Sequence, residues 1–226
     1  SDQTIFAALK GIGVYKSVDA GSIWSLVNTG LTELDVRDFA ISPNYAADQT
    51  IFVCTGGGGI FKSTDGGNSW SAVNMGLFTT YVFHFAISPD YANDQTIFAV
   101  GGNGVYKSTN GGSNWNVVNT GLTDTDSLSA IAISPNYAVD QTIFVGTYYF
   151  GHVFKSVNGG GSWSVVLNQP YVRFLAISPN YAVDQTIFVG TNQGYSVRKS
   201  TNGGSSWSVY NTGMGNVDVI SLAISP

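Results

Sequence analysis

Short apolar runs separated by turn residues repeat along this chain of 226 residues. Residues 35–74 show the pattern most clearly, with the runs DVRDFAIS, TIFVCT, GIFKS and WSAVN. Runs of this length that are rich in aromatic and β-branched residues and bounded by Gly, Pro, Asn or Asp predict β-strands. The chain is therefore predicted to form units of four antiparallel strands, here called A to D, with strand A innermost.

The tryptophans give the period of these units. The motif Ser-x-Asp/Asn-x-Gly-x-x-Trp occurs five times and uses every tryptophan, at intervals of 46, 45, 48 and 44 residues. Four strands repeated at this spacing predict the blade of a β-propeller. We therefore predict an all-β, five-bladed propeller in a single domain over residues 1–226, closed by pairing of the C-terminal strand with the three N-terminal strands. The blades are expected at 1–28 plus 217–226, 35–74, 81–119, 127–168 and 171–211.

The tryptophan motif has a mechanical interpretation. A short carboxylate or amide accepts backbone N–H bonds inside a tight turn, glycine supplies positive φ, and tryptophan covers the base of the hairpin. The acidic position is Asp in two copies and Asn in three, which indicates hydrogen bonding and not charge or metal binding. The residues given this structural role are Ser17, Asp19, Gly21, Trp24, Ser63, Asp65, Gly67, Trp70, Ser108, Asn110, Gly112, Trp115, Ser156, Asn158, Gly160, Trp163, Ser200, Asn202, Gly204 and Trp207.

The motif and its period resemble the Asp-box (BNR) propeller families, which include sialidases, sortilin-type receptors, Ycf48-type assembly factors and xyloglucanase-type hydrolases. The resemblance covers the whole chain and implies the propeller fold. It implies no single activity, because such different functions share the scaffold. It favours an extracytoplasmic or secreted location. The copies are unusually alike, so an engineered, reconstructed or excised repeat array with no evolved ligand is one alternative.

The loops at the two ends of the blades differ in how much they vary between copies. The A–B turns, such as SPNYAADQT and SPDYANDQT, and the C–D hairpins are nearly uniform, whereas the B–C and D–A loops diverge. Divergent loops on a rigid scaffold are where binding usually occurs, although drift is the alternative explanation. Aromatic residues beside Arg, Asp and His suit stacking on sugars or anchoring a protein surface. The candidate ligand-binding residues are Tyr148, Tyr149, Phe150, His152, Tyr171, Arg173, Tyr81, His84 and Arg37.

No catalytic residue is predicted. A sialidase-type site needs three arginines on one carboxylate, and Arg198, one of the three present, replaces an aromatic residue of strand C. Glu33 is the only glutamate, and no register selects a pair of acids for glycoside hydrolysis. The two histidines lack metal-ligand spacing, so no metal or cofactor is expected. We interpret the chain as a non-enzymatic binding or scaffold propeller for a carbohydrate or a protein surface. A fragment of a glycoside hydrolase is the second alternative.

Charge and hydropathy exclude other classes of partner. The net charge of −5 offers no basic footprint for nucleic acid or an anionic membrane. No apolar run approaches the roughly 18 residues of a membrane span. A monomer is expected.

Overall fold

The computed structural model describes every residue except 1–2, 195–196, 216–217, 220 and 226. The chain separates into two compact units. The first comprises Ser1–Gly101 with Tyr106–Val117, and the second comprises Gly102–Val105 with Val118–Pro226. Each unit has its own core of apolar side chains between neighbouring sheets. The prediction of a single domain over the whole chain stays a prediction.

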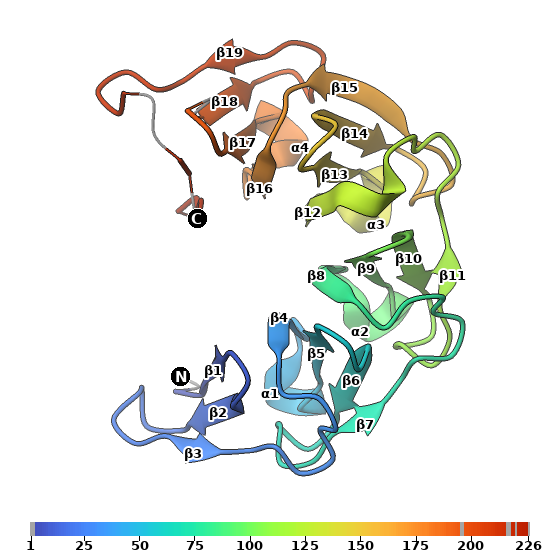
Figure 1. Cartoon of the computed structure of the whole chain (residues 1–226), viewed down its shortest axis with the longest axis vertical. Helices are drawn as coiled ribbons and strands as arrows, with labels where there is room; N and C mark the ends of the chain where they lie inside the picture. Colours follow the sequence, from blue (N-terminus) through green and yellow to red (C-terminus); the bar gives the residue numbers. More distant parts are fainter. Residues whose placement is uncertain (1–2, 195–196, 216–217, 220, 226) are drawn as a thin grey trace. The chain divides into compact units, whose positions relative to one another are not determined.

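Three antiparallel sheets lie wholly or mostly in the first unit, one for each of the first three repeats (Figure 1). The first sheet has three strands, and the other two have four. The strands are β1 (Ile5–Leu9), β2 (Gly13–Ser17), β3 (Ser25–Leu26), β4 (Val36–Ile41), β5 (Ile51–Thr55), β6 (Ile60–Ser63), β7 (Ser71–Ala72), β8 (Val82–Ile87), β9 (Ile97–Gly101), β10 (Gly104–Ser108) and β11 (Asn116–Val117).

Two further four-stranded sheets form the second unit. Their strands are β12 (Leu128–Ile133), β13 (Ile143–Thr147), β14 (His152–Ser156), β15 (Ser164–Asn168), β16 (Val172–Ile177), β17 (Ile187–Thr191), β18 (Val197–Ser200) and β19 (Ser208–Val209). A 3-10 turn, η1 (Thr125–Ser127), precedes β12. Five sheets, one per repeat and each in simple antiparallel order, confirm the predicted all-β, five-bladed propeller class.

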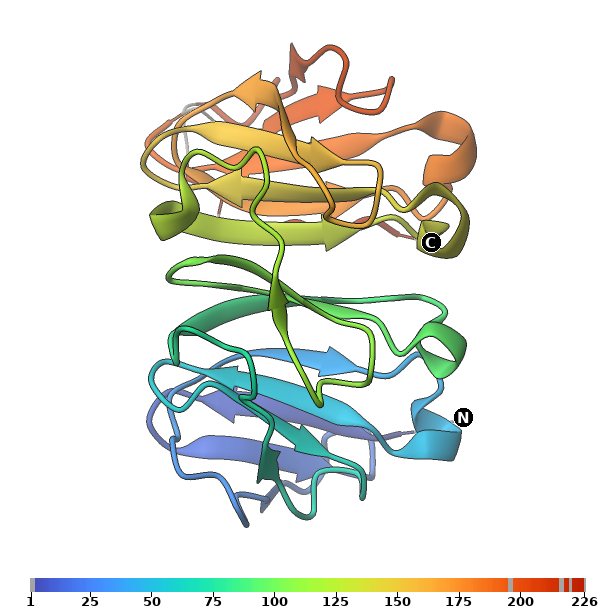
Figure 2. The same ribbon diagram turned by 90° about the vertical axis from the view of Figure 1, so that its right-hand side faces the viewer.

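Each A–B connection contains one turn of helix, where the sequence predicted only a turn. The helices are α1 (Tyr45–Asp48), α2 (Tyr91–Asp94), α3 (Tyr137–Asp140) and α4 (Tyr181–Asp184). The Asp at the helix end explains the uniform sequence: Asp48 accepts the Ser42 hydroxyl at 2.6 Å and the Thr50 N–H at 2.8 Å. In each unit these helices gather at one end of the sheets (Figure 2). The antiparallel order therefore places the B–C and D–A loops at the other end.

Side chains of the repeat also join neighbouring sheets. Trp70 donates its indole N–H to the Val27 carbonyl of the preceding sheet at 2.8 Å. The Lys62 ammonium donates to the Gly111 carbonyl of the following sheet at 2.8 Å and lies 5.3 Å from the ring centre of Phe52. The sequence analysis missed the lysines, although a lysine precedes the motif serine in all five copies.

The first sheet shows what this coupling contributes. Trp24 is 40% exposed, whereas Trp70 and Trp115 are 4% and 1% exposed. Trp24 donates its indole N–H to the Gly21 carbonyl of its own hairpin, at 3.0 Å.

The predicted closure concerns residues 217–226, of which 217, 220 and 226 lie outside the described residues. The described residues of this segment belong to no strand, and the first sheet has three strands. The segment instead meets the fifth sheet of its own unit, where the Val219 N–H donates to the Thr191 carbonyl at 2.9 Å. A side chain at Gly190 would collide with Val219, just as one at Gly146 would collide with Val172. Pairing of this segment with β1–β3 therefore stays a prediction.

Candidate functional site

The residues of the tryptophan motif hold their own hairpins. In the second copy Asp65 Oδ1 accepts the Ser63 hydroxyl at 2.7 Å and the Ser69 N–H at 2.9 Å. In the fourth copy Asn158 Oδ1 accepts the Ser156 hydroxyl and the Ser162 N–H, both at 2.9 Å. Carboxylate and amide thus accept the same two bonds. These contacts support the predicted structural role and leave the divergent loops as the place to look for binding.

An aromatic cluster lies at the divergent end of the second unit. It joins the loop after β13 to the loop before β16. The Tyr148 ring makes edge contacts with the rings of Tyr149 and Tyr171, with centres 4.9 and 5.5 Å apart. The Arg173 guanidinium lies 5.6 Å from the centre of the Tyr148 ring. Tyr149 is 72% exposed and Phe150 is 60% exposed, so two rings of this cluster face solvent.

Backbone hydrogen bonds hold the two loops together. The Tyr148 N–H donates to Ser127 at 2.8 Å, and the Tyr171 N–H donates to the Tyr148 carbonyl at 2.7 Å. The Tyr171 carbonyl in turn accepts the Asn192 N–H at 3.0 Å. Tyr171 has φ of 61°, a left-handed conformation that is strained for a bulky residue. Strain of this kind persists only where surrounding contacts impose it, and it is common at binding sites.

The fourth repeat departs here from the other four, a feature that the sequence analysis missed. Four and six residues after the motif tryptophan the other copies have Asn and Gly, as in Asn74 and Gly76, but the fourth has Leu167 and Gln169. Asn74 accepts the Ile60 N–H at 2.7 Å and so fixes the hairpin. The fourth repeat instead extends its outer strand, β15, to five residues, where the outer strands of the other described sheets have two.

This replacement leaves a buried polar group without a partner. Gln169 is only 2% exposed, and its side-chain Nε2 has no hydrogen-bond partner among the described residues. The Gln169 backbone N–H donates to the Gly151 carbonyl at 2.5 Å, which places the residue beside the aromatic loop. A buried amide donor without a partner costs about 1–3 kcal/mol, so its presence needs a reason other than stability.

His152 joins the aromatic loop to the D–A loop of the same repeat. Its Nδ1 contacts the Asp124 carboxylate, and both side chains are partly buried. The His152 backbone N–H donates to the Thr147 hydroxyl at 2.8 Å. Asp124 is therefore paired. Among the residues that the structure describes, no three His, Cys, Asp or Glu side chains are grouped to hold a metal ion.

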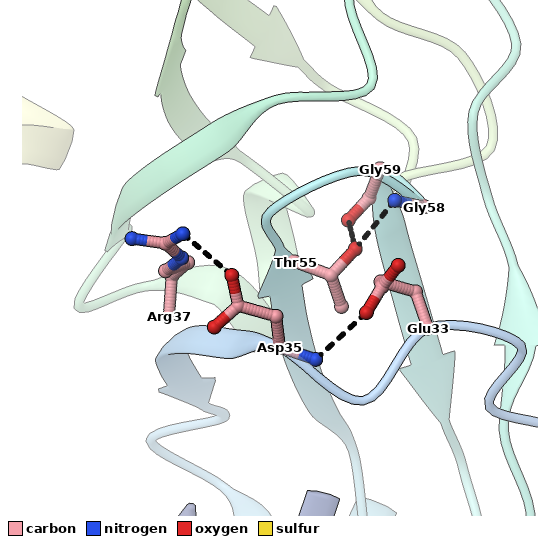
Figure 3. A network of polar contacts seen from close by, with 6 residues as sticks. All are labelled: Glu33, Asp35, Arg37, Thr55, Gly58 and Gly59. Carbon is pink, nitrogen blue, oxygen red and sulfur yellow. Dashed lines mark hydrogen bonds and ion pairs between the residues drawn. The ribbon is translucent and has the colours of Figure 1, made fainter. Parts of the chain in front are cut away.

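The other three predicted site residues lie in the first unit. Arg37 forms an ion pair with Asp35 at 2.5 Å, and Glu33 Oε1 accepts the Asp35 N–H at 2.9 Å (Figure 3). His84 Nδ1 lies 3.5 Å from Asp38. Tyr81 is exposed. The nine predicted residues thus fall into two groups: Tyr148, Tyr149, Phe150, His152, Tyr171 and Arg173 in the second unit, and Arg37, Tyr81 and His84 in the first.

A glycine-rich loop lies beside this network in the first unit. Thr55 Oγ1 accepts the Gly58 N–H and donates to the Gly59 carbonyl, each at 3.0 Å (Figure 3). A side chain at Gly56 would collide with Asp35 and with Arg37, whose Nη2 would be 2.9 Å from the new carbon. A larger residue at this position would therefore have to displace the ends of these two charged side chains. Since the carboxylate already neutralises Arg37, this network offers less unpaired charge than the aromatic cluster.

Comparison with known proteins shows the fold and no more. No protein-family model matches the chain, and no curated protein matches its sequence. An ancestral GH74 enzyme superposes with a TM-score of 0.75 at 24% identity, over 96% of this chain and 31% of its own. The computationally designed Ika8 protein superposes with a TM-score of 0.69 at 14% identity, over 100% of this chain and 64% of its own. YCF48 bound to D1 peptide superposes with a TM-score of 0.64 at 13% identity, over 92% of this chain and 65% of its own.

These neighbours are β-propellers of unlike function, in agreement with the strand order described above. The chain spans about a third of the length of the GH74 enzyme. None of the helices among the described residues has the length and apolar character needed to cross a membrane.

Proposed function

We propose that this chain is a non-enzymatic binding module of the Asp-box propeller type. In this proposal it recognises a carbohydrate or a protein surface through the aromatic cluster of its fourth and fifth sheets. The observation that carries the proposal is the departure of the fourth repeat. Only there are the structural Asn and Gly replaced, and only there do three successive aromatic residues, Tyr148, Tyr149 and Phe150, occupy the B–C loop.

The cost of this departure supports the proposal. A loop free to drift has no need of a bulky residue at positive φ or of a buried amide donor without a partner. Tyr171 and Gln169 provide one of each beside the exposed rings. Exposed aromatic rings next to Arg and His are suited to stacking on a sugar ring or filling the pocket of a partner. YCF48, a structural neighbour, has been solved with a bound peptide, which is in keeping with a protein partner.

The acidic residues near the cluster support binding without catalysis. Asp124 is paired with His152, and Asp218 accepts the Gln193 N–H at 2.5 Å. Both carboxyl groups therefore already have a partner, whereas glycoside hydrolysis requires a pair of free carboxyl groups. The similarity to a GH74 enzyme is the reason to retain a hydrolase fragment as a competing function. The similarity to a designed propeller is the reason to retain, as a second alternative, a repeat protein without an evolved ligand. An extracytoplasmic location and a monomeric state belong to the same proposal.

The test is a paired screen of the purified chain on glycan and peptide arrays, repeated with Tyr149→Ala and with Phe78→Ala as the matched control. Phe78 is 76% exposed and belongs to the first unit, whereas the cluster belongs to the second. Tyr149→Ala should weaken binding by about 1–3 kcal/mol, the range of an interface anchor, with an unchanged melting temperature. Phe78→Ala should leave binding unchanged.

Three results would contradict the proposal. Binding that resists Tyr149→Ala would place the ligand elsewhere. Turnover of a chromogenic glycoside would favour the hydrolase. Absence of binding to any glycan or peptide in the screen would favour a repeat protein without an evolved ligand.

A further inference from the structure

Two arginines occupy the same position of the repeat and have opposite surroundings. Arg37 and Arg173 each follow the first residue of strand A, at Val36 and Val172. Val36 pairs with Thr55 and Val172 with Thr191, and in both strands the register shifts at the arginine. The strand register around the two arginines is therefore the same, although the residue before the valine has positive φ only in the fifth repeat, and the two sites form an internal comparison.

The difference lies in the residue before the valine. In the second repeat that residue is Asp35, whose carboxylate pairs with Arg37 at 2.5 Å. In the fifth repeat it is Tyr171, and no described carboxylate forms an ion pair with Arg173. Arg173 is exposed and lies against the Tyr148 ring. Stacking on an aromatic face leaves the N–H groups at the edge of a guanidinium free to donate.

We infer that the aromatic cluster binds a carbohydrate that carries carboxylate groups, with Arg173 holding one carboxylate while a neighbouring sugar ring stacks on Tyr149. This rests on the proposed function and names the ligand class for the same surface. A planar guanidinium matches a carboxylate with two parallel hydrogen bonds. The exposed Tyr149 ring supplies the flat apolar face that a pyranose ring needs.

The hydrogen bonding of the loops favours a sugar over an extended peptide. Peptides that add to a protein as a strand use free backbone N–H and C=O groups. Here the backbone N–H groups of Tyr148, His152 and Tyr171 all donate within the protein. These three N–H groups are therefore not available to a peptide strand, which favours recognition through side chains, the usual way a protein reads the hydroxyl and carboxylate groups of a glycan.

Charge indicates that the recognition is local. The chain carries a net charge of −5, so its overall field does not attract a polyanion. Binding should depend on one contact at short range, and short oligomers should bind as well per site as long ones.

The experiment is calorimetric titration with a short oligomer of galacturonic acid, with the same oligomer after methyl esterification, and with polyglutamate of matched charge. The free acid should bind at least about tenfold more tightly than the ester, because a hydrogen bond to a charged group is worth more than one to a neutral group. Arg173→Gln should remove this preference, and Arg37→Gln should not alter it.

Tyr171→Asp is the most direct variant, since it gives the fifth repeat the residue type that precedes the valine in the second. It puts a carboxylate two residues before Arg173, the same sequence separation as between Asp35 and Arg37. Asp also tolerates positive φ better than Tyr, so the fold should not suffer. Tyr171→Asn has nearly the same shape and no charge. We expect Tyr171→Asp to abolish the preference for the free acid, and Tyr171→Asn to retain it.

The outcomes separate this inference from the proposed function. Equal binding of acid and ester, with loss of both in Tyr149→Ala, would overturn the carboxylate assignment and leave the binding function standing. Unchanged binding of the acid by Arg173→Gln would overturn the role of Arg173. Polyglutamate that binds as tightly, with the same dependence on Arg173, would overturn the assignment to a carbohydrate. Failure of every oligomer to bind would overturn the ligand class.

Discussion

Replacement of Asp65 by Asn and by Ala tests whether the tryptophan motif works by hydrogen bonding. Asp65 accepts three bonds from neighbours: the Ser63 hydroxyl at 2.7 Å, the Ser69 N–H at 2.9 Å and the Ser69 hydroxyl at 2.5 Å. An amide keeps the first two through its Oδ1. It reverses the third, as Asn158 does by donating Nδ2 to the Ser162 hydroxyl at 3.0 Å. Asp65→Asn should therefore change the free energy of unfolding by no more than about 0.5 kcal/mol at neutral pH.

Asp65→Ala removes all three acceptors. Water can replace part of what is lost because the site is exposed, so we expect a cost of about 1–3 kcal/mol. Urea denaturation at pH 7 measures both variants. The matched control is Asn110→Asp, the reverse exchange in the third copy, where Oδ1 accepts the Asn114 N–H at 2.9 Å. It should also be nearly neutral. Equal losses from Asp65→Asn and Asp65→Ala would refute hydrogen bonding as the role, as would calcium-dependent stabilisation that Asp65→Asn removes.

The same pair of variants has a distinct pH dependence. Hydrogen bonds from Ser69 in the first place, and also from Ser63, lower the pKa of Asp65 from 3.8 to about 2. A carboxyl group whose pKa is lower in the folded state stabilises the protein above pH 3.8 and loses that stabilisation as the pH falls toward 2. Wild type should therefore lose about 1 kcal/mol relative to Asp65→Asn between these values, once solvent screening is allowed for.

Three other perturbations follow from the contacts between and within sheets. Trp70→Phe leaves the Val27 carbonyl without its indole donor and should cost about 1–2 kcal/mol, measured by calorimetry; no loss would mean that water replaces the bond. Lys62→Met loses both the bond to Gly111 and the position of the ammonium over the Phe52 ring, and should cost about 1 kcal/mol. Burial lowers the pKa of Lys62, so wild-type stability should rise with pH just below 10.5, and Lys62→Met should not show this rise. Deletion of residues 217–226 removes the contacts of Val219 with the fifth sheet and should lower the melting temperature and promote aggregation; a soluble truncation with unchanged melting would contradict the closure prediction.

The repeat could be predicted from the sequence because the interactions that define it join residues close together in the chain. The side-chain bonds within each copy of the tryptophan motif connect residues no more than four apart, as between Ser63 and Gly67 at 2.8 Å, so their residue types must recur at fixed spacing. Strand length and turn composition are local as well. The helical turns such as Tyr45–Asp48 were not predicted, because four residues are too few for a helical period to show.

Contacts between repeats could not be predicted from the sequence. Lys62 and Gly111 are 49 positions apart, and nothing near either residue indicates the other. The candidate site divides in the same way. The run Tyr148-Tyr149-Phe150 was visible as three aromatic residues in a loop. The stacking of Arg173 on Tyr148 was not, because it joins two loops that only the tertiary structure brings together.

The sequence by itself determined the five repeats, their strands, the hairpins of their tryptophan motifs and the end at which the loops diverge, since each depends on interactions within a few residues. Only the tertiary structure decided what each divergent side chain does there. Arg37 and Arg173 occupy one position of the repeat, yet one is neutralised by Asp35 and the other is left free to donate. The reason is physical: the charge available at a surface depends on which groups lie within a few ångströms, and folding sets those distances.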